Sequence, residues 1–319
     1  MTAPFDLSQL QLRDTTIVEN FPLSAVSYFK IGGKARYFLQ VKYQGDLPVI
    51  LNYLLDHKIP YHLFGSMSNV LFADEDFSGV MIQYLANDFL VGDQKLRVSA
   101  GAKMSAVAKV AIESGLAGLA EFESLPGTIG GAIYNNSHYG DKFITDHLVD
   151  VEVFDPETRG IINLKKEDLE LDYDQSIFHR KNYVIIDAVF RFPRSDSQVE
   201  EELAKLAREK REASQPLSDA SAGCFFQNPL MTDELKEKFP EFKDKERISA
   251  GFLIDQCGLK GKKSGGAQIS TKHAAFIINA GGATAKDVLT LAQEVMDAVE
   301  EKFGVKLEKE VIVITENGK

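Results

Sequence analysis

Residues 121–140 read Glu-Phe-Glu-Ser-Leu-Pro-Gly-Thr-Ile-Gly-Gly-Ala-Ile-Tyr-Asn-Asn-Ser-His-Tyr-Gly. In this stretch Gly127, Gly130 and Gly131 follow closely after Pro126. Glycines at this density permit positive φ and leave the backbone open to close approach by another group. Successive bare amides can form a concave nest for an anion such as a pyrophosphate. A glycine-rich turn between two elements has the same pattern, so the stretch alone leaves both interpretations open.

Two further glycine loops lie upstream of this stretch. Residues 28–35 read Tyr-Phe-Lys-Ile-Gly-Gly-Lys-Ala, and residues 64–71 read Phe-Gly-Ser-Met-Ser-Asn-Val-Leu. None of the three loops has the G-x-G-x-x-G spacing of a Rossmann site or the G-x-x-x-x-G-K-[ST] spacing of a P-loop. Those two kinds of nucleotide site are therefore not expected here.

In their order along the chain, the three loops resemble those of the bacterial UDP-N-acetylenolpyruvoylglucosamine reductases of cell-wall synthesis, and the resemblance extends over most of the chain. In that family the three loops wrap FAD. One position departs from the family pattern, because Met67 stands where the family carries a glycine, which narrows the room for the pyrophosphate. The resemblance implies that the following residues bind the cofactor: Ile31, Gly32, Gly33, Gly65, Ser66, Met67, Ser68, Asn69, Pro126, Gly127, Thr128, Gly130, Gly131 and Ala132.

Composition excludes several classes of protein. The chain has 319 residues, enough for two or three domains, and a net charge of -11, which argues against a nucleic-acid partner. No apolar run approaches the roughly 18 residues of a membrane span, and residues 1–14 lack the pattern of a signal peptide. The two cysteines, Cys224 and Cys257, make neither a metal site nor a disulfide framework. We expect a cytoplasmic protein with no metal and no membrane partner, whose oligomeric state the sequence leaves open.

Hydrophobic periodicity predicts mixed helices and strands. The clearest helix is 285–303, with Thr284 as its N-cap, Asp287 in a capping box and Gly304 at its end. Residues 1–20 are interpreted as a leader to the first folded unit. Other helices are expected at 46–57, 105–114 and 199–213, and strands at 36–41, 61–64, 80–82, 96–98, 149–154, 183–192, 274–279 and 311–314.

The expected fold class is α+β. The resemblance implies an FAD-binding domain of the vanillyl-alcohol-oxidase/PCMH type over residues 15–195, followed by a C-terminal α+β substrate domain over residues 196–319. The first domain is expected to consist of two α/β subdomains, at about 15–82 and 83–195. The boundary near residue 195 follows a shift to polar composition at 193–197.

A candidate acid lies in residues 221–229, which read Ser-Ala-Gly-Cys-Phe-Phe-Gln-Asn-Pro. In the family a serine in this segment protonates the substrate carbon, and Cys224 takes its place here. A thiol with a reference pKa of about 8.5 is largely protonated at neutral pH and is a better acid than a hydroxyl. Read alone, Cys224 is better explained as a small buried apolar side chain. The flanking match favours the acid.

Two further groups of polar residues match the family. Residues 307–311 resemble its L-E-x-E-V segment, in which the second glutamate, here Glu310, works with the acid. Read alone, Glu310 is a surface carboxylate at the start of a strand. The amides of Gln227 and Asn228 suit a nucleotide-sugar diphosphate, and the resemblance places a substrate contact on Asn228.

Residues 172–178 carry the largest departure. The family reads Y-R-x-S-x-F here, and its arginine holds the substrate carboxylate. Tyr173 and Ser176 match as substrate-binding residues, but Asp174 replaces the arginine. An aspartate repels a carboxylate, so another cation must act, and we expect Arg180 to supply it.

The resemblance implies that NADPH reduces bound FAD, and that the flavin then gives hydride to the enolpyruvyl ether of UDP-N-acetylglucosamine to form UDP-N-acetylmuramate, a peptidoglycan precursor. The catalytic residues would be Cys224, Glu310 and Arg180. Two alternatives stay open. Another oxidoreductase of the same FAD fold would share the glycine loops but not residues 222–229 or 307–311. A flavin-binding protein that has lost the reductase step is favoured by Asp174.

Overall fold

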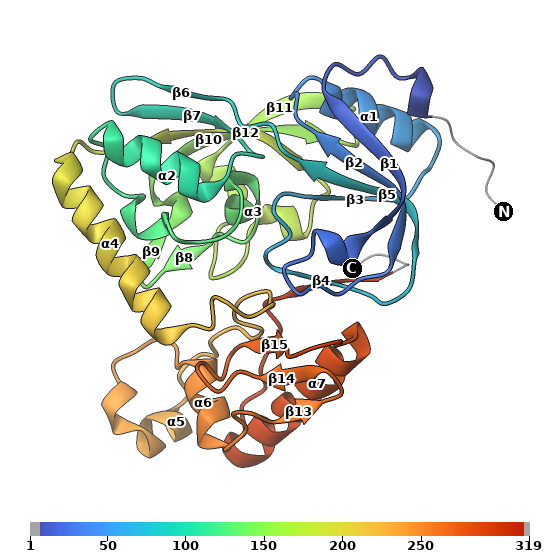
Figure 1. Cartoon of the computed structure of the whole chain (residues 1–319). Coiled ribbons are helices and arrows are strands. Elements are labelled where there is room, and N and C mark those ends of the chain that lie inside the picture. The colour runs from blue at the N-terminus through green and yellow to red at the C-terminus, as the bar shows by residue number, and fades with distance from the viewer. Residues whose placement is uncertain (1–6, 316–319) are drawn as a thin grey trace. The chain divides into compact units, whose positions relative to one another are not determined.

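The computed structural model describes residues 7–315 (Figure 1). Within them the chain forms two compact units. The first unit contains residues up to 21 together with 35–66 and 78–210, and the second contains 22–34, 67–77 and the chain from 211 onward. The domain ranges predicted from the sequence are continuous, whereas these units are not, because two N-terminal segments belong to the second unit.

The first unit begins with a four-stranded sheet in the order β1-β2-β5-β3, formed by β1 (Thr15–Pro22), β2 (Lys34–Val41), β5 (Phe77–Tyr84) and β3 (Tyr61–Phe64). Helix α1 (Asp46–Asp56) contributes Leu47, Ile50, Leu51 and Leu54 to the core. The prediction of a leader is wrong for residues 15–20, which belong to β1. This strand lies at the sheet edge, and its partly exposed, polar residues weaken the alternation that would reveal it. Residues 1–6 lie outside the described residues.

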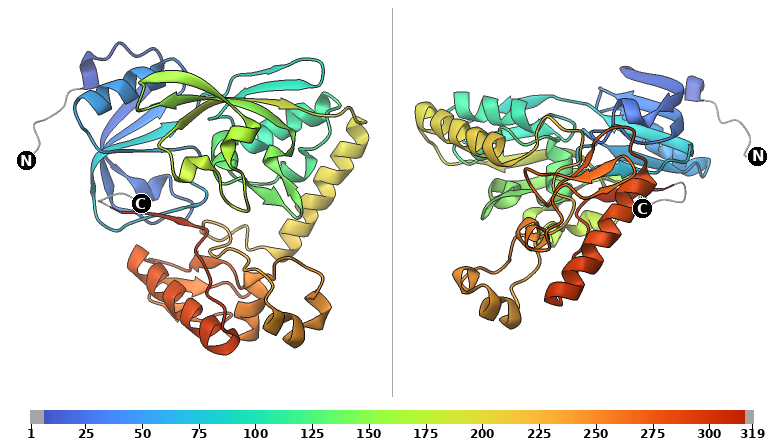
Figure 2. Two further views of the ribbon diagram at one scale, coloured as in Figure 1. Left: turned by 180° about the vertical axis from the view of Figure 1, so that it is seen from behind. Right: turned by 60° about the horizontal axis from the view of Figure 1, so that its bottom comes forward.

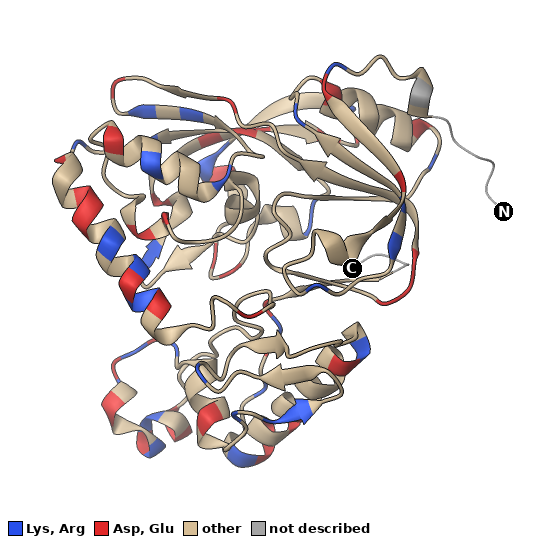
Figure 3. Cartoon of the chain, viewed as in Figure 1, with Lys and Arg blue, Asp and Glu red and all other residues tan. Residues whose placement is uncertain are grey.

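The second sheet of this unit has five antiparallel strands in the order β11-β10-β12-β7-β6. They are β6 (Phe89–Val91), β7 (Lys95–Ser99), β10 (Leu148–Asp155), β11 (Gly160–Lys165) and β12 (Val184–Arg191). Helix α2 (Met104–Glu113) ends, as predicted, before Gly115, whose φ is +63°. The predicted helix at 199–213 is α4 (Ser197–Ser214), whose charged residues run along the ribbon in Figure 3, while Ala204 packs with Ile112 and Ala120.

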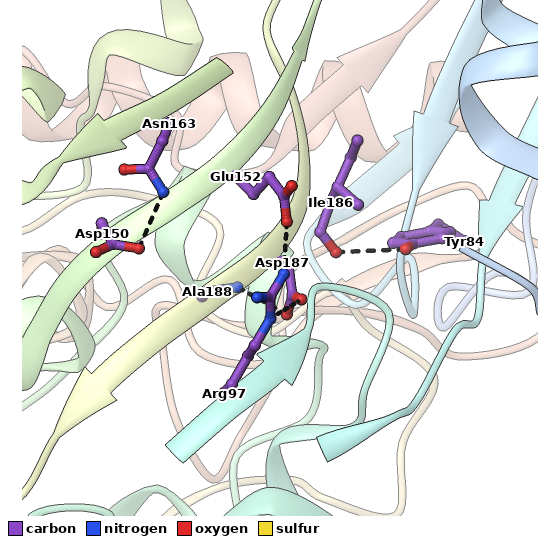
Figure 4. Close-up of polar contacts among 8 residues, drawn as sticks. All are labelled: Tyr84, Arg97, Asp150, Glu152, Asn163, Ile186, Asp187 and Ala188. Carbon is purple, nitrogen blue, oxygen red and sulfur yellow. Dashed lines mark hydrogen bonds and ion pairs between the residues drawn. The ribbon is translucent and has the colours of Figure 1, made fainter. Parts of the chain in front are cut away.

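A polar cluster crosses the strands of the five-stranded sheet (Figure 4). Arg97 bonds the carboxylates of Asp187 and Glu152 at 2.7 Å each. Burial raises the pKa of Asp187, and its bond to Arg97 opposes that rise. The hydroxyl of Tyr84 donates to the carbonyl of Ile186 at 3.3 Å, and burial, reinforced by nearby carboxylates, raises the pKa of this phenol. Arg97 therefore offsets the free-energy cost of burying the Asp187 carboxylate in the sheet.

We expect Arg97→Met to destabilise the protein by about 1–3 kcal/mol near neutral pH, because Asp187 then loses its charged partner. A carboxyl whose pKa is higher in the folded than in the unfolded state stabilises the protein at low pH. This contribution is lost as pH rises through the folded pKa. Without Arg97 that pKa rises further, so the loss is smaller at about pH 4, where more of the carboxyl is protonated, than at about pH 7. Urea unfolding at both values measures it.

Lys109→Met is the matched control for this substitution. Lys109 pairs with Glu113 at 3.8 Å on the surface of α2, and exposed pairs of this kind contribute at most about 1 kcal/mol. Equal losses for Arg97→Met at both pH values would contradict the assignment to Asp187.

The second unit contains a small antiparallel sheet, β13 (Lys263–Ser264), β14 (Ala267–Ile269) and β15 (Ile277–Asn279). Helices α5 (Asp233–Lys238), α6 (Ala250–Gln256) and α7 (Ala285–Phe303) complete it (Figure 2). In the same unit, β16 (Ile312–Ile314) pairs in parallel with β4 (Val70–Phe72). The core contains one apolar face of α7: Val288, Leu291, Ala292, Val295 and Val299.

The predicted ends of α7 are confirmed. Thr284 and Asp287 form a capping box, and Gly304 adopts the left-handed conformation at the C-cap with φ +68°. The carboxylate of Asp74 also accepts hydrogen bonds from the amides of Ala285 and Lys286, at 2.8 and 3.1 Å. The segment around Asp74 is thus bound to the C-terminal part of the second unit through the first turn of α7.

Candidate active site

The glycine stretch of the first unit forms the start of a short helix, α3 (Ile129–Tyr134), rather than a turn. Thr128 is its N-cap, and its Oγ1 accepts a hydrogen bond from the Gly131 amide at 3.3 Å. The amides of Ile129 and Gly130 donate to the carbonyls of Ala102 and Ala100, which follow β7. These bonds fix the stretch against the end of the five-stranded sheet.

The loop that follows β3 approaches the same helix start. A Cβ added at Gly65 would lie 2.0 Å from Oγ1 of Thr128, so only glycine allows this contact. Among the described residues, the backbone amides of Gly127 and Thr128 donate to no protein acceptor, although Thr128 is buried. Buried amides normally have a partner, and adjacent amides of this kind suit an anion. The residues present therefore fit a phosphate-bearing cofactor such as FAD.

Two predicted substrate residues, Tyr173 and Ser176, belong to a segment bound to the chain that leaves α3. The hydroxyl of Ser176 donates to the carbonyl of Tyr134 at 2.6 Å. The side-chain amide of Asn136 donates to the carbonyl of Asp172 at 2.9 Å. The structure thus brings the 172–176 segment and the glycine stretch into one region of the first unit.

Within that region, Asp174 lies close to a histidine. Nε2 of His138 lies 3.8 Å from Oδ1 of Asp174, and the rings of His138 and Tyr173 are 4.8 Å apart. Arg180 instead forms an ion pair with Glu170 at the surface, and 67% of its side chain is exposed. His138 is not among the residues predicted for the site. Asp174 is the signal that could have pointed to His138, because an aspartate in place of the family's arginine suggests that a basic residue lies nearby.

In the second unit, main-chain pairing brings Cys224 and Glu310 into one region. Cys224 forms an isolated antiparallel bridge with Phe276, and the amide of Glu310 donates to the carbonyl of Phe225 at 2.9 Å. The side-chain amide of Asn69 donates to the carbonyl of Glu310 at 3.2 Å. Cys224 is only partly buried. Three predicted site residues from distant parts of the sequence therefore share one neighbourhood.

Gln227 and Asn228 follow in the same segment. The amide of Gln227 donates to the carbonyl of Glu308 at 2.9 Å, which continues the pairing. Oδ1 of Asn228 accepts a hydrogen bond from the amide of Ala250 at 2.9 Å, at the first residue of α6. The oxygen of the Asn228 side chain thus supports a helix start, in addition to any contact with substrate.

The remaining predicted cofactor residues of the second unit lie in its two N-terminal segments. A Cβ at Gly33 would lie 2.3 Å from the carbonyl oxygen of Glu75, and Gly32 has φ +140°. Both positions therefore require glycine for a local reason. Met67 is buried and takes a left-handed φ of +59°, a conformation that glycine adopts without strain. Ile31 is buried in the core of this unit, and Ser68 is partly buried.

A separate hollow of about 570 Å³ opens on the first unit, and Arg13, Tyr43, Asp88 and Lys103 are among its lining residues. It includes none of the residues predicted for the site.

The part of the chain that the structure describes has no cluster of three or more metal-binding side chains. In that same part, every helix is too short or too polar to cross a membrane.

Comparisons with known proteins agree with this geometry. Residues 35–161 match a family model described as an FAD binding domain, and residues 215–314 match the C-terminal domain of UDP-N-acetylenolpyruvoylglucosamine reductase. The reductase of that name from Chlamydia muridarum is 36% identical over 94% of this chain and 95% of its own length. The one from Clostridium perfringens is 34% identical over 93% of each.

A solved structure supports the same assignment. The crystal structure of the UDP-N-acetylenolpyruvylglucosamine reductase from Thermus caldophilus aligns with a TM-score of 0.75 and 28% identity, over 94% of this chain and 98% of that one. The predicted α+β fold with an FAD-binding domain is thereby confirmed. The chain belongs to the family of UDP-N-acetylenolpyruvoylglucosamine reductases.

Proposed function

We propose that the protein is an FAD-dependent reductase that uses NADPH to convert the enolpyruvyl ether of UDP-N-acetylglucosamine into UDP-N-acetylmuramate for peptidoglycan synthesis. The observation that carries the proposal is family membership over almost the whole chain. The amides of Gly127 and Thr128, which suit a phosphate, support it independently. A cytoplasmic location belongs to the proposal, since NADPH and UDP-sugars are intracellular reactants.

When bound, FAD takes two electrons from NADPH and passes them on as hydride. In the first unit the protein would hold its phosphates with the amides at 127–128, and Gly65 would keep the two loops close enough to do so. The predicted contacts of the second unit, Ile31 to Gly33 and Met67 to Asn69, stay proposals. Their glycines are required by local packing, so their presence alone does not identify a ligand.

Cys224 would donate the proton that completes the product, because a thiol is a better general acid than a hydroxyl and this one, only partly buried, is within reach of a reactant. Glu310 would act beside it, since the Glu310 amide bonds the carbonyl of Phe225, the residue next to Cys224. Gln227 and Asn228 would contact the nucleotide sugar from the same segment. In the first unit, Tyr173 and Ser176 would contact the substrate next to the glycine stretch.

A second candidate function is a flavin-binding protein without reductase activity, which is favoured by Asp174. A carboxylate at this position opposes an anionic substrate. The nearby imidazole of His138 argues for retained activity, because it provides a basic group in the same place.

We expect the purified protein to be yellow and to release FAD into the supernatant on acid precipitation. No cysteine or histidine lies within residues 28–35, 64–71 or 125–132, so those loops offer no residue of the kind that usually attaches a flavin covalently. We also expect NADPH to bleach the flavin and NADPH oxidation to become continuous only when the enolpyruvyl sugar is added.

Three results separate the candidates. Bleaching without sugar-dependent turnover would favour the flavin-binding protein. Oxygen-dependent NADPH oxidation that ignores the sugar would favour another oxidoreductase. A colourless protein that takes up no FAD would contradict all three candidate functions: the reductase, the flavin-binding protein and another flavin oxidoreductase.

A further inference from the structure

Asn69 contacts the segment that carries Glu310 at two points. Its side-chain nitrogen donates to the carbonyl of Glu310 at 3.2 Å, and its own carbonyl accepts a hydrogen bond from the amide of Ile312 at 3.1 Å. A carbonyl oxygen can only accept, so the nitrogen of the side-chain amide, and not its oxygen, faces Glu310. The two bonds lie on either side of Val311, which is buried in the core of the second unit. Asn69 therefore restrains residues 310–312 from both ends.

Glu310 lies where the chain changes its pairing partner. Before this point the chain pairs with the segment next to Cys224, and the amide of Glu310 donates to the carbonyl of Phe225 at 2.9 Å. From Ile312 onward it pairs with β4 instead. A residue between two pairings depends on the contacts at the crossing for its position, and Asn69 supplies two of them.

The side chain of Asn69 can bind a cofactor and hold Glu310 at the same time. Its bond to Glu310 uses one hydrogen of the amide, and the side-chain oxygen and the second hydrogen remain for a ligand. Both residues belong to the second unit, and both are only partly buried, so a ligand can reach either of them. One side chain thus connects a residue predicted to bind FAD with a residue predicted to act in catalysis.

We propose that Asn69 is a positioning residue for Glu310. Its side-chain amide ties the predicted cofactor loop to the main chain of the predicted catalytic glutamate, and so fixes where the carboxylate meets the substrate. The inference rests on the proposed function and adds a second role to the predicted contact between Asn69 and FAD. A misplacement of about 1 Å at a reacting group can cost about 10²-fold in rate. The bond to Glu310 can therefore matter more for turnover than for folding.

Asn69→Ala removes the side-chain bond and keeps the main-chain one. At saturating FAD, we expect this variant to be reduced by NADPH at the natural rate, because that step does not involve Glu310. Reoxidation of the reduced flavin by the enolpyruvyl sugar should slow by about 10- to 100-fold. Stopped-flow absorbance measures both steps. A residue that only binds the cofactor would instead raise the Kd for FAD and leave reoxidation normal in the saturated protein.

A double-mutant cycle tests whether Asn69 acts through Glu310. Adding Asn69→Ala to Glu310→Gln should slow reoxidation by less than about threefold further, because the carboxylate to be positioned is already absent. Effects that multiply as if independent would overturn the inference. Reoxidation at the natural rate in Glu310→Gln would also overturn it, since the position of that carboxylate would then be irrelevant to the reaction.

Hydrogen exchange tests the contact itself, even in a variant that binds FAD poorly. The amides of Glu310 and Ile312 are both hydrogen-bonded, so a loosened segment should exchange them faster. In Asn69→Ala we expect peptides that cover residues 309–314 to exchange at least about threefold faster, while peptides from α7 keep their natural rates. Unchanged exchange at 309–314 would overturn the inference whatever the kinetics show.

Gln268→Ala is the matched control. Gln268 belongs to the same unit, and its side-chain amide also donates to a main-chain carbonyl, that of Gly261, at 3.3 Å. This control should keep natural reoxidation and natural exchange at 309–314. A loss in it equal to that of Asn69→Ala would overturn the inference, because any bond of this kind would then have the same effect.

Failure of the natural chain to oxidise NADPH with the enolpyruvyl sugar is a different result. It overturns the proposed function, and the catalytic role inferred for Asn69 with it, before any variant is compared. The exchange experiment would then still decide whether Asn69 holds the segment of Glu310.

Discussion

Replacing Cys224 with alanine should lower turnover of the enolpyruvyl sugar by roughly 10²-fold or more, the usual contribution of a general acid. The same variant should still bind FAD and be reduced by NADPH, because neither step needs a proton at the substrate carbon. Stopped-flow absorbance separates the two half-reactions: the first should keep its rate, and reoxidation by the sugar should become slow.

Cys224→Ser should retain much of the activity, since a hydroxyl can also donate a proton from this position. Iodoacetamide should inactivate the natural protein, and bound substrate should protect it. The chain has only two cysteines, so one substitution is enough to distinguish alkylation at Cys224 from alkylation at Cys257. Cys257 packs against the core of the second unit, where burial raises the pKa of its thiol against the opposing charges of Lys302 and Lys238, and a thiol with a raised pKa reacts slowly.

A Cys257→Ser background therefore isolates alkylation at Cys224. The serine can keep the contact that the Cys257 sulfur makes with the carbonyl of Ala298 at 3.6 Å. Natural turnover in Cys224→Ala would mean that Cys224 only packs, and that Glu310 or water donates the proton.

The second large effect is expected at Gly65. In Gly65→Ala the new methyl group would lie 2.0 Å from Oγ1 and 2.7 Å from Cγ2 of Thr128. Thr128 is buried and caps α3, so relief of the clash must move the loop that carries the two available amides. Overpacking of this kind costs about 1–3 kcal/mol. If that cost falls on the FAD-bound arrangement, the Kd for FAD rises by about 10- to 100-fold.

Gly92→Ala provides the control for Gly65→Ala. A Cβ at Gly92 meets no atom within 4 Å, so the same chemical change has no steric consequence there. Flavin content after purification and fluorescence titration of the apoprotein compare the two variants. Equal FAD affinity in both would show that Gly65 does not shape the cofactor site.

The sequence predicted those elements whose signals are local. The helix α7 was predicted at its observed bounds, because its apolar face has helical spacing and its caps are formed by Thr284, Asp287 and Gly304. The glycine stretch was expected as a loop, but six of its residues form α3, since bonds to Ala100 and Ala102 compensate for the poor helix propensity of glycine. Bonds to a segment that is distant in the sequence leave no trace in the stretch itself.

For the candidate site, the resemblance to the family identified the candidate residues, and the structure showed which of them lie near one another. The proximity of Cys224 to Glu310 depends on main-chain pairing between segments far apart in the chain, which no local pattern encodes. The contact between His138 and Asp174 depends on side chains that meet only after the 172–176 turn binds the end of α3. The roles of all these residues stay predictions until the variants are measured.

The pairing of β4 with β16 has a consequence for synthesis on the ribosome. Asn69 and Glu310, which bond beside this pair, are 241 positions apart. At about 5–20 residues per second, the segments at 22–34 and 67–77 wait roughly 10–50 s for the strand that completes their unit. During that interval the edge of β4 is exposed to other chains. Nascent molecules that stall before residue 312 should therefore depend on chaperones more than finished ones, and ribosome profiling with chaperone pull-down would reveal it.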